Sequence, residues 1–178
     1  MVLAASTLDV LTDACEGVRR EDPSLVPGLA PTTGRGAPKA RRTGPSPRLC
    51  YRAFLSVSGG RILVGRGAAD NDELTLHIAR PYDLWLHVKG ERGAHVVVSL
   101  KRGHDAPGEL LIDAAHLAAH FSDARGETVI DVTYAPRRFV RKRRGSPPGQ
   151  VQVDREKTLV LRVDAARLAA LLGREESS

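Results

Sequence analysis

A proline- and glycine-rich segment between residues 23 and 48 limits where this chain can fold. The segment holds six of the eleven prolines, with four glycines among them. Such a composition cannot bury a core and stays extended. We therefore predict three parts: a short helix within residues 1–22, a flexible basic linker over residues 23–48, and a folded domain over residues 49–178. A length of about 130 residues is ordinary for one domain.

Hydrophobic periodicity within residues 49–178 predicts both strands and helices. The predicted strands cover residues 50–57, 61–65, 84–88, 94–100, 128–134, 150–153 and 158–163. The predicted helices run from an Asp70 or Asn71 cap to residue 79, over residues 109–122, and from an Asp164 cap to Gly173. Because strands and helices do not alternate regularly, we expect an α+β fold with a mixed, largely antiparallel sheet and a few packed helices.

Several predicted strands alternate apolar and polar residues, which indicates a sheet with one buried and one partly solvated face. In residues 84–88 the apolar side chains share one face, and Trp85, His87 and Lys89 share the other. Residues 94–100 place His95 on the polar face in the same way. We expect His87, Lys89 and His95 to form a polar surface patch if these strands are neighbours.

The net charge of +6 is unevenly distributed along the chain. Six basic residues and no acidic residue lie in one short run: Arg137, Arg138, Arg141, Lys142, Arg143 and Arg144. A second stretch without acidic residues covers residues 35–52. Together the two segments hold 12 of the 27 basic residues of the chain. Clustered cations are typical of proteins that bind a polyanion, so we predict a nucleic-acid partner. An arginine-rich loop that only keeps the protein soluble is the alternative.

Composition argues against several other classes of protein. Two cysteines are too few for a disulfide framework or a four-cysteine zinc site. No apolar run is long enough to cross a membrane, and the N-terminal residues lack the basic start of a signal peptide, so we expect a cytoplasmic protein. Aromatic residues make up 4% of the chain, which is too few for a base-stacking platform. Binding should therefore be directed mainly at phosphates and shape.

Catalytic and metal sites are weaker interpretations of the polar residues. Asp83, His87 and His95 could form an acid–base or metal cluster if the strands bring them together. His116 and His120 share a helix face at the spacing of two zinc ligands, but no third ligand is evident, so we expect a solvated helix face. We predict no cofactor and no catalytic residues.

The turn Gly65-Arg66-Gly67 leaves two interpretations open. It can simply turn the chain from a strand into a helix. It can also place Arg66 beside a helix N-terminus, where anions are favoured.

Motifs spread over residues 50–163 resemble the NFACT-R (DUF814) family. They occur in the order of the family: Val64-Gly65-Arg66, Asn71-Asp72-Glu73-Leu74-Thr75, Ala79-Arg80-Pro81, Asp83-Leu84-Trp85-Leu86-His87, Gly93-Ala94-His95-Val96-Val97, a helix with Ala114-Ala115, Ala118 and Ser122, Val140-Arg141-Lys142, Pro148-Gly149-Gln150-Val151, and Lys157-Thr158-Leu159. NFACT-R is the C-terminal RNA-binding domain of NFACT ribosome-quality-control proteins, which include the bacterial fibronectin-binding-protein-like group. The resemblance implies an α+β fold and RNA binding.

The chain also departs from the family pattern. Gly67 stands where the family often has Asn, and Ala94 stands where it usually has Ser. Lys142-Arg143-Arg144-Gly145 replaces the usual Lys-Pro-Lys-Gly and keeps the charge. NFACT proteins carry further N-terminal and coiled-coil parts that this sequence does not resemble, so it looks like a stand-alone NFACT-R protein.

We therefore expect a non-catalytic module that binds structured RNA, namely tRNA, ribosomal RNA or the large ribosomal subunit, with a link to ribosome quality control or translation. The predicted RNA-contacting residues are Arg66, Arg80, Lys89, His95, Arg137, Arg138, Arg141, Lys142, Arg143 and Arg144. Two alternatives stay open: an RNA-processing or RNA-modifying enzyme that uses Asp83, His87 and His95, and a module that docks on a ribosomal protein.

Overall fold

The computed structural model describes residues 48–176. The predicted N-terminal helix and nearly all of the predicted linker lie outside these residues. Within residues 48–176, no helix combines the length and apolar character needed to cross a membrane.

A seven-stranded sheet forms the centre of the described part of the chain. Its strands lie in the order β8 (Lys157–Arg162), β5 (Val129–Pro136), β3 (Leu84–Val88), β4 (Val96–Val98), β2 (Arg61–Gly65), β1 (Tyr51–Leu55) and β9 (Glu175–Glu176). All of these pairs are antiparallel, and β6 (Val140–Arg141) and β7 (Gln152–Val153) form a small second sheet that is also antiparallel. Helices pack against this sheet, so the predicted α+β class is confirmed.

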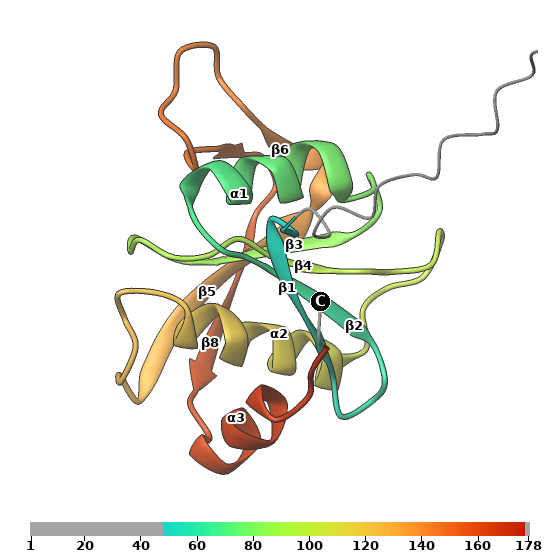
Figure 1. Cartoon of the computed structure of the whole chain (residues 1–178), viewed down its shortest axis with the longest axis vertical. Helices are drawn as coiled ribbons and strands as arrows, with labels where there is room; N and C mark the ends of the chain where they lie inside the picture. The colour runs from blue at the N-terminus through green and yellow to red at the C-terminus, as the bar shows by residue number, and fades with distance from the viewer. Residues whose placement is uncertain (1–47, 177–178) are drawn as a thin grey trace, which may run out of the picture. The chain divides into compact units, whose positions relative to one another are not determined.

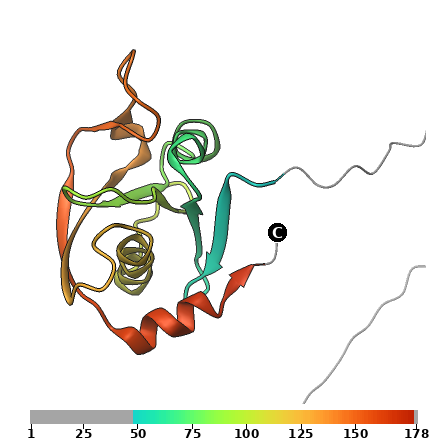
Figure 2. The same ribbon diagram turned by 60° about the vertical axis from the view of Figure 1, so that its left-hand side comes forward.

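Helices cover both faces of the sheet (Figure 1). On one face lie α1 (Ala68–Glu73), the π-helical turn η1 (Leu74–Ile78) that continues it, the 3-10 turn η2 (Arg137–Phe139), and the small β6–β7 sheet. On the other face lies α2 (Gly108–His120), with α3 (Ala165–Leu172) beyond it. The sheet curls around α2, as the view along that helix shows (Figure 2). The apolar faces of the helices therefore bury both sides of the central strands.

The main core lies between the sheet and α2. It contains Phe54, Ile62, Leu86, Val96 and Leu117, none of which is exposed. The predicted apolar stripe of residues 109–122 packs here, because residues three and four apart share one side of a helix. Burial of these side chains is the main stabilising contribution to this layer.

A second core lies on the face that we predicted to be partly solvated, and the prediction of a polar surface patch there is wrong because His95 is buried. Trp85 is 3% exposed and Val97 is completely buried, and both pack with Leu74 and Val140 beneath α1, η1 and β6. Apolar and polar residues do alternate along β3, but the face that carries Trp85 and His87 lies under a short helix rather than in water. Sequence periodicity within a strand cannot reveal a covering element from another part of the chain.

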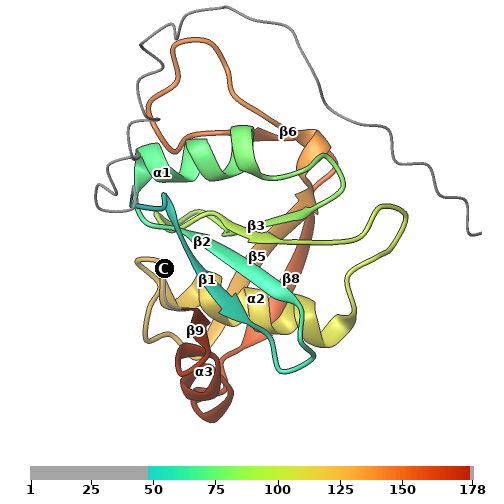
Figure 3. The same ribbon diagram turned by 45° about the vertical axis from the view of Figure 1, so that its right-hand side comes forward.

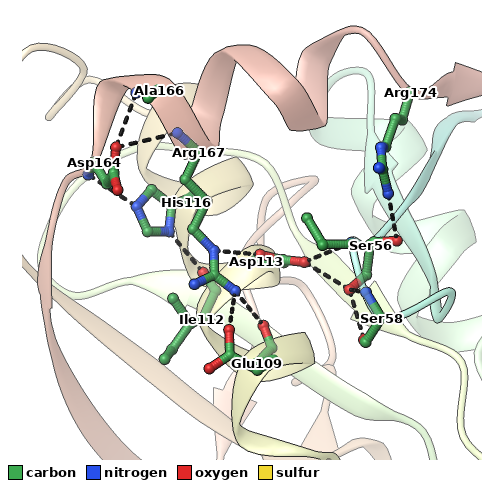
Figure 4. Close-up of polar contacts among 11 residues, drawn as sticks. Ser56, Ser58, Glu109, Ile112, Asp113, His116, Asp164, Ala166, Arg167 and Arg174 are labelled. Carbon is green, nitrogen blue, oxygen red and sulfur yellow. Dashed lines mark hydrogen bonds and ion pairs between the residues drawn. The ribbon is translucent and has the colours of Figure 1, made fainter.

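Polar groups attach α3 to α2 and to the β1–β2 turn (Figure 4). Asp113 is completely buried; one of its carboxylate oxygens accepts from the Arg167 guanidinium at 2.6 Å, and the other accepts from the Ser56 hydroxyl at 2.6 Å. The His116 ring bridges the Ile112 carbonyl, at 2.9 Å, and the backbone N–H of Asp164, at 3.0 Å. Our prediction of a solvated helix face around His116 is therefore wrong, because α3 covers it.

Helix boundaries follow local capping chemistry only in part. Asp164 caps α3 as predicted, since its carboxylate accepts from the N–H groups of Ala166 and Arg167, and Gly173 ends the helix. The predicted cap of α1 at Asp70 or Asn71 is wrong, because the helix begins at Ala68 after Gly67. Asn71 instead lies inside the helix and is 5% exposed.

Candidate nucleic-acid interface

The basic run occupies η2, β6 and the start of the loop between β6 and β7. This loop, residues 142–151, stands over α1 (Figure 3). Lys142 attaches it there: its ammonium group lies 2.7 Å from the carboxylate of Asp72 on α1 and donates to the Pro147 carbonyl at 2.6 Å. The side chain is largely buried, so Lys142 holds the loop in place rather than facing solvent.

Arg137 also turns inward. Its guanidinium donates to the carbonyls of Thr75, Leu76 and Val140. Thr75 and Leu76 belong to η1, whose last carbonyls have no partner within the helix. Burial lowers the pKa of Arg137, as expected for a cation withdrawn from water. Its partners give Arg137 a structural role, and we leave it out of the RNA contacts proposed below.

Four cations of the run remain exposed: Arg138, Arg141, Arg143 and Arg144. The Arg138 guanidinium lies 4.9 Å from the centre of the Phe139 ring, with Arg155 at 5.1 Å from the same ring. Arg141 lies 3.8 Å from Asp154, and this pair is largely exposed. An exposed pair of this kind contributes little to stability and exchanges readily for a phosphate.

Arg143 and Arg144 lie on a hollow of about 500 Å³ in the loop, which we call the loop hollow. Its other walls are the backbone and side chains of residues 145–147 and 150–152. Arginine favours bidentate contacts with phosphate oxygens, so this hollow suits a polyanion.

A larger hollow of about 870 Å³, which we call the central groove, lies beside it. Three segments meet there: the turn between β2 and α1 (residues 65–68), the loop between β3 and β4 (residues 90–94), and residues 147–150 of the basic loop. Arg66 and Arg92 line it, together with His87 and Phe121. Pro147 and Gln150 line both hollows, so the two adjoin at these residues.

Asn71 lines the central groove and links α1 to the β3–β4 loop by hydrogen bonds. Its side-chain oxygen accepts from the His95 backbone N–H at 3.0 Å, and its amide donates to the Gly93 carbonyl at 3.2 Å. A Cβ atom on Gly65 would lie 2.1 Å from the Asn71 oxygen, so only glycine fits beside it. This explains why Gly65 and Asn71 occur together in the resemblance motifs.

Gly149 closes the other side of the groove. Its φ of +80° lies in the left-handed region that favours glycine, and a Cβ atom there would lie 3.2 Å from Ala68. Gly149 therefore lets the basic loop approach α1 closely.

Two neighbouring histidines lie on the sheet behind this groove. The His87 and His95 rings are 5.5 Å apart, and the Trp85 ring stacks with His87 at 5.8 Å. His87 is half-buried, and burial lowers its pKa, so the ring is neutral at pH 7. Burial, with a smaller contribution from the neighbouring His87, lowers the pKa of His95 to about 4.

The predicted position of His95 is wrong: the side chain is 1% exposed and its Nδ1 is 2.8 Å from the Thr75 hydroxyl. Being under η1, His95 cannot reach a phosphate, and we remove it from the proposed RNA contacts. Arg80 and Lys89 are exposed, but neither lines the loop hollow or the central groove. Arg66 does line the central groove, and its guanidinium donates to the Tyr51 carbonyl at 3.2 Å.

The structure does not assemble the acid–base cluster considered from the sequence. The Asp83 carboxylate accepts from the backbone N–H groups of Arg80 and Leu100. Asp83 precedes β3 and lies four residues before His87, which is about 13 Å along a strand. No group of three or more His, Cys, Asp or Glu side chains arranged to hold a metal occurs in residues 48–176.

Sequence reasoning missed several residues of this surface. Arg92 and Gln150 lie outside the charge run, and no periodicity singles them out. Arg52 lies 5.2 Å over the Phe121 ring. Burial lowers the pKa of His120, with smaller contributions from Arg125 and Arg52. Arg52 of β1 and Arg125 thus lie near the His120–Phe121 ring pair, and Phe121 lines the central groove. The glycines around Arg66 and Arg92 were the signal that could have pointed to a backbone-lined hollow.

Two adjoining hollows lined by arginines on an α+β domain are typical of nucleic-acid-binding modules. Residues 50–155 match the model of the NFACT protein RNA-binding domain. The chain belongs to this family, as the resemblance of its motifs implied.

Relatives of known name support the same assignment. The Rqc2 homolog RqcH of Bacillus subtilis is 34% identical over 137 residues, which is 77% of this chain and 23% of that protein. Coiled-coil domain-containing protein 25 of Bos taurus is 28% identical over 128 residues, which is 70% of this chain and 61% of that protein. The chain thus spans about a quarter of the length of the B. subtilis relative.

A solved structure has the same fold. The C-terminal part of the fibronectin/fibrinogen-binding protein from Streptococcus suis matches with a TM-score of 0.65 and 33% sequence identity. The match covers 75% of this chain and 53% of that one.

Proposed function

We propose that residues 49–178 form a non-catalytic RNA-binding domain that recognises structured RNA through the loop hollow and the central groove. The observation that carries this proposal is that the two hollows adjoin at Pro147 and Gln150, with Arg143 and Arg144 on one and Arg66 and Arg92 on the other. Arginines from three separate segments thus border two adjoining hollows, which matches the spaced phosphates of an RNA chain.

The RNA contacts that we propose are Arg66, Arg92, Arg138, Arg141, Arg143 and Arg144. Lys142 and Arg137 act indirectly, because their charged groups hold the loop and η1. We propose tRNA, ribosomal RNA or the large ribosomal subunit as the target, in the cytoplasm. A link to ribosome quality control is supported by the similarity to RqcH.

The test is a salt titration of binding to tRNA, ribosomal RNA fragments and duplex DNA. One variant changes Arg138, Arg141, Arg143 and Arg144 to Gln. A matched control changes four exposed cations on other surfaces to Gln: Lys101, Arg102, Lys157 and Arg162. Each lost phosphate contact should lower the log–log salt slope by about 0.7–0.9, so the first variant should lose up to about 3.6.

Preference for RNA, with a reduced slope in the first variant alone, supports the proposal. Equal loss in both variants means that only net charge matters, and an unchanged slope places the interface elsewhere. Binding to ribosomes that survives nuclease treatment would favour docking on a ribosomal protein. Turnover of RNA that His87→Ala abolishes would favour the enzyme alternative.

A further inference from the structure

The central groove has the dimensions of a site for one small ligand. Hollows of about 300–1,000 Å³ hold small molecules, and the groove of about 870 Å³ lies in this range. Five of its lining residues are glycines: Gly65, Gly67, Gly90, Gly93 and Gly149. Backbone groups and small side chains therefore form much of its walls, which leaves room for a flat group between them.

The lining of the groove includes charged side chains. Arg66 and Arg92 supply cations, and Glu91 is the acidic residue among the lining side chains. Arg52 lies over Phe121, which also lines the groove. A phosphate group is therefore favoured beside these arginines.

Two aromatic rings, those of His87 and Phe121, also line the groove. The His87 ring is nearly parallel to that of the buried Trp85, with an angle of 15° between them. Burial lowers the pKa of His87, which favours the uncharged ring, and backbone groups of Gly93 and Val88 hold that ring in place. An uncharged ring suits the edge or face of a nucleobase better than a phosphate.

We propose that the central groove binds one unpaired nucleotide of the RNA, with its base against His87 and its phosphate beside Arg66 and Arg92. This inference rests on the proposed RNA-binding function and adds to it a requirement for an unpaired base. A duplex cannot satisfy this requirement, because its bases are stacked and paired in the interior.

The experiment measures the affinity of the full chain for three short RNA hairpins with the same stem. One carries a single bulged adenosine, one carries an abasic residue at the same place, and one is fully paired. We expect the wild-type protein to bind the bulged adenosine about tenfold more tightly than the abasic hairpin, since contact with a base typically contributes this much. His87→Ala should bind these two hairpins equally.

A second pair of variants guards against an effect of His87→Ala on folding. Gly67→Phe places a ring on the rim of the groove, where the backbone is extended and a Cβ atom meets only the Asp70 carboxylate at 3.8 Å. Gly108→Phe is the matched control, because a Cβ atom there meets nothing within 4 Å. Gly108 begins α2 and Phe121 follows its end, so the control lies about 20 Å away from the groove. Only Gly67→Phe should remove the tenfold preference.

Failure of this inference and failure of the proposed function give different results. Equal wild-type affinity for all three hairpins, with a normal salt slope, overturns the nucleotide site and leaves the RNA-binding function standing. A preference that persists in both His87→Ala and Gly67→Phe also overturns it. If the wild-type protein binds no RNA at all, the proposed function fails as well.

Discussion

At the scale of single residues, the fold changes the ionisation of His95. Its folded pKa of about 4 lies below the ordinary value of 6.5, because burial disfavours the charged ring. Between these pH values the unfolded chain binds a proton that the folded protein does not. The free energy of unfolding should therefore fall as the pH is lowered from about 6.5 to about 4, by roughly 3 kcal/mol from this group.

We predict that His95→Gln weakens this pH dependence. The slope of unfolding free energy against pH near pH 5 should decrease by about 1.4 kcal/mol per pH unit, which corresponds to one proton. Denaturant unfolding at several pH values measures this slope. His104→Gln, at an exposed loop position, serves as the control. Identical slopes for His95→Gln and wild type would mean that His95 titrates normally in the folded protein.

Within the basic run, we expect Arg137 to stabilise the fold and Arg144 to bind RNA. Arg137→Gln leaves the carbonyls of Thr75, Leu76 and Val140 without their guanidinium partner, so we expect a loss of stability of about 2 kcal/mol. Arg144→Gln, at an exposed position, should lower RNA affinity and leave the melting temperature unchanged. Thermal unfolding and RNA binding of both variants test this division, and the reverse pattern would contradict it.

At the scale of elements, the attachment of α3 depends on the buried carboxylate of Asp113. Arg167 neutralises it from α3, and Ser56 binds it from the β1–β2 turn (Figure 4). Arg167→Met removes the cation and leaves the carboxylate buried. Loss of one partner of a buried pair typically costs about 3–5 kcal/mol, and we expect the lower value because Arg167 is 22% exposed.

Denaturant unfolding of Arg167→Met measures this cost, and Arg162→Met on the exposed side of β8 is the matched control. The double variant Asp113→Asn with Arg167→Met should recover part of the lost stability, because the uncompensated charge is gone. Additive losses in the double variant would argue against a direct interaction between the two side chains.

At the scale of the whole described domain, the two hollows should bind the same RNA chain. Arg66→Gln with Arg92→Gln removes cations from the central groove, and Arg143→Gln with Arg144→Gln removes them from the loop hollow. Each pair should lower the log–log salt slope by up to about 1.8, and the four changes together by up to about 3.6. Salt titration with tRNA measures these slopes. If either pair alone abolishes the salt dependence, a single continuous interface is ruled out.

The sequence alone determined the fold class, most strand positions and both boundaries of α3, because these depend on periodicity and on local capping. It also located the exposed arginines at residues 138, 141, 143 and 144, since they lie in one continuous run. Tertiary structure decided the environment of His95, His116 and Trp85, because elements distant in sequence cover each of them. Tertiary structure also turned Arg137 and Lys142 inward and brought Arg66, Arg92 and Gln150 to one groove, since only chain folding joins separate loops.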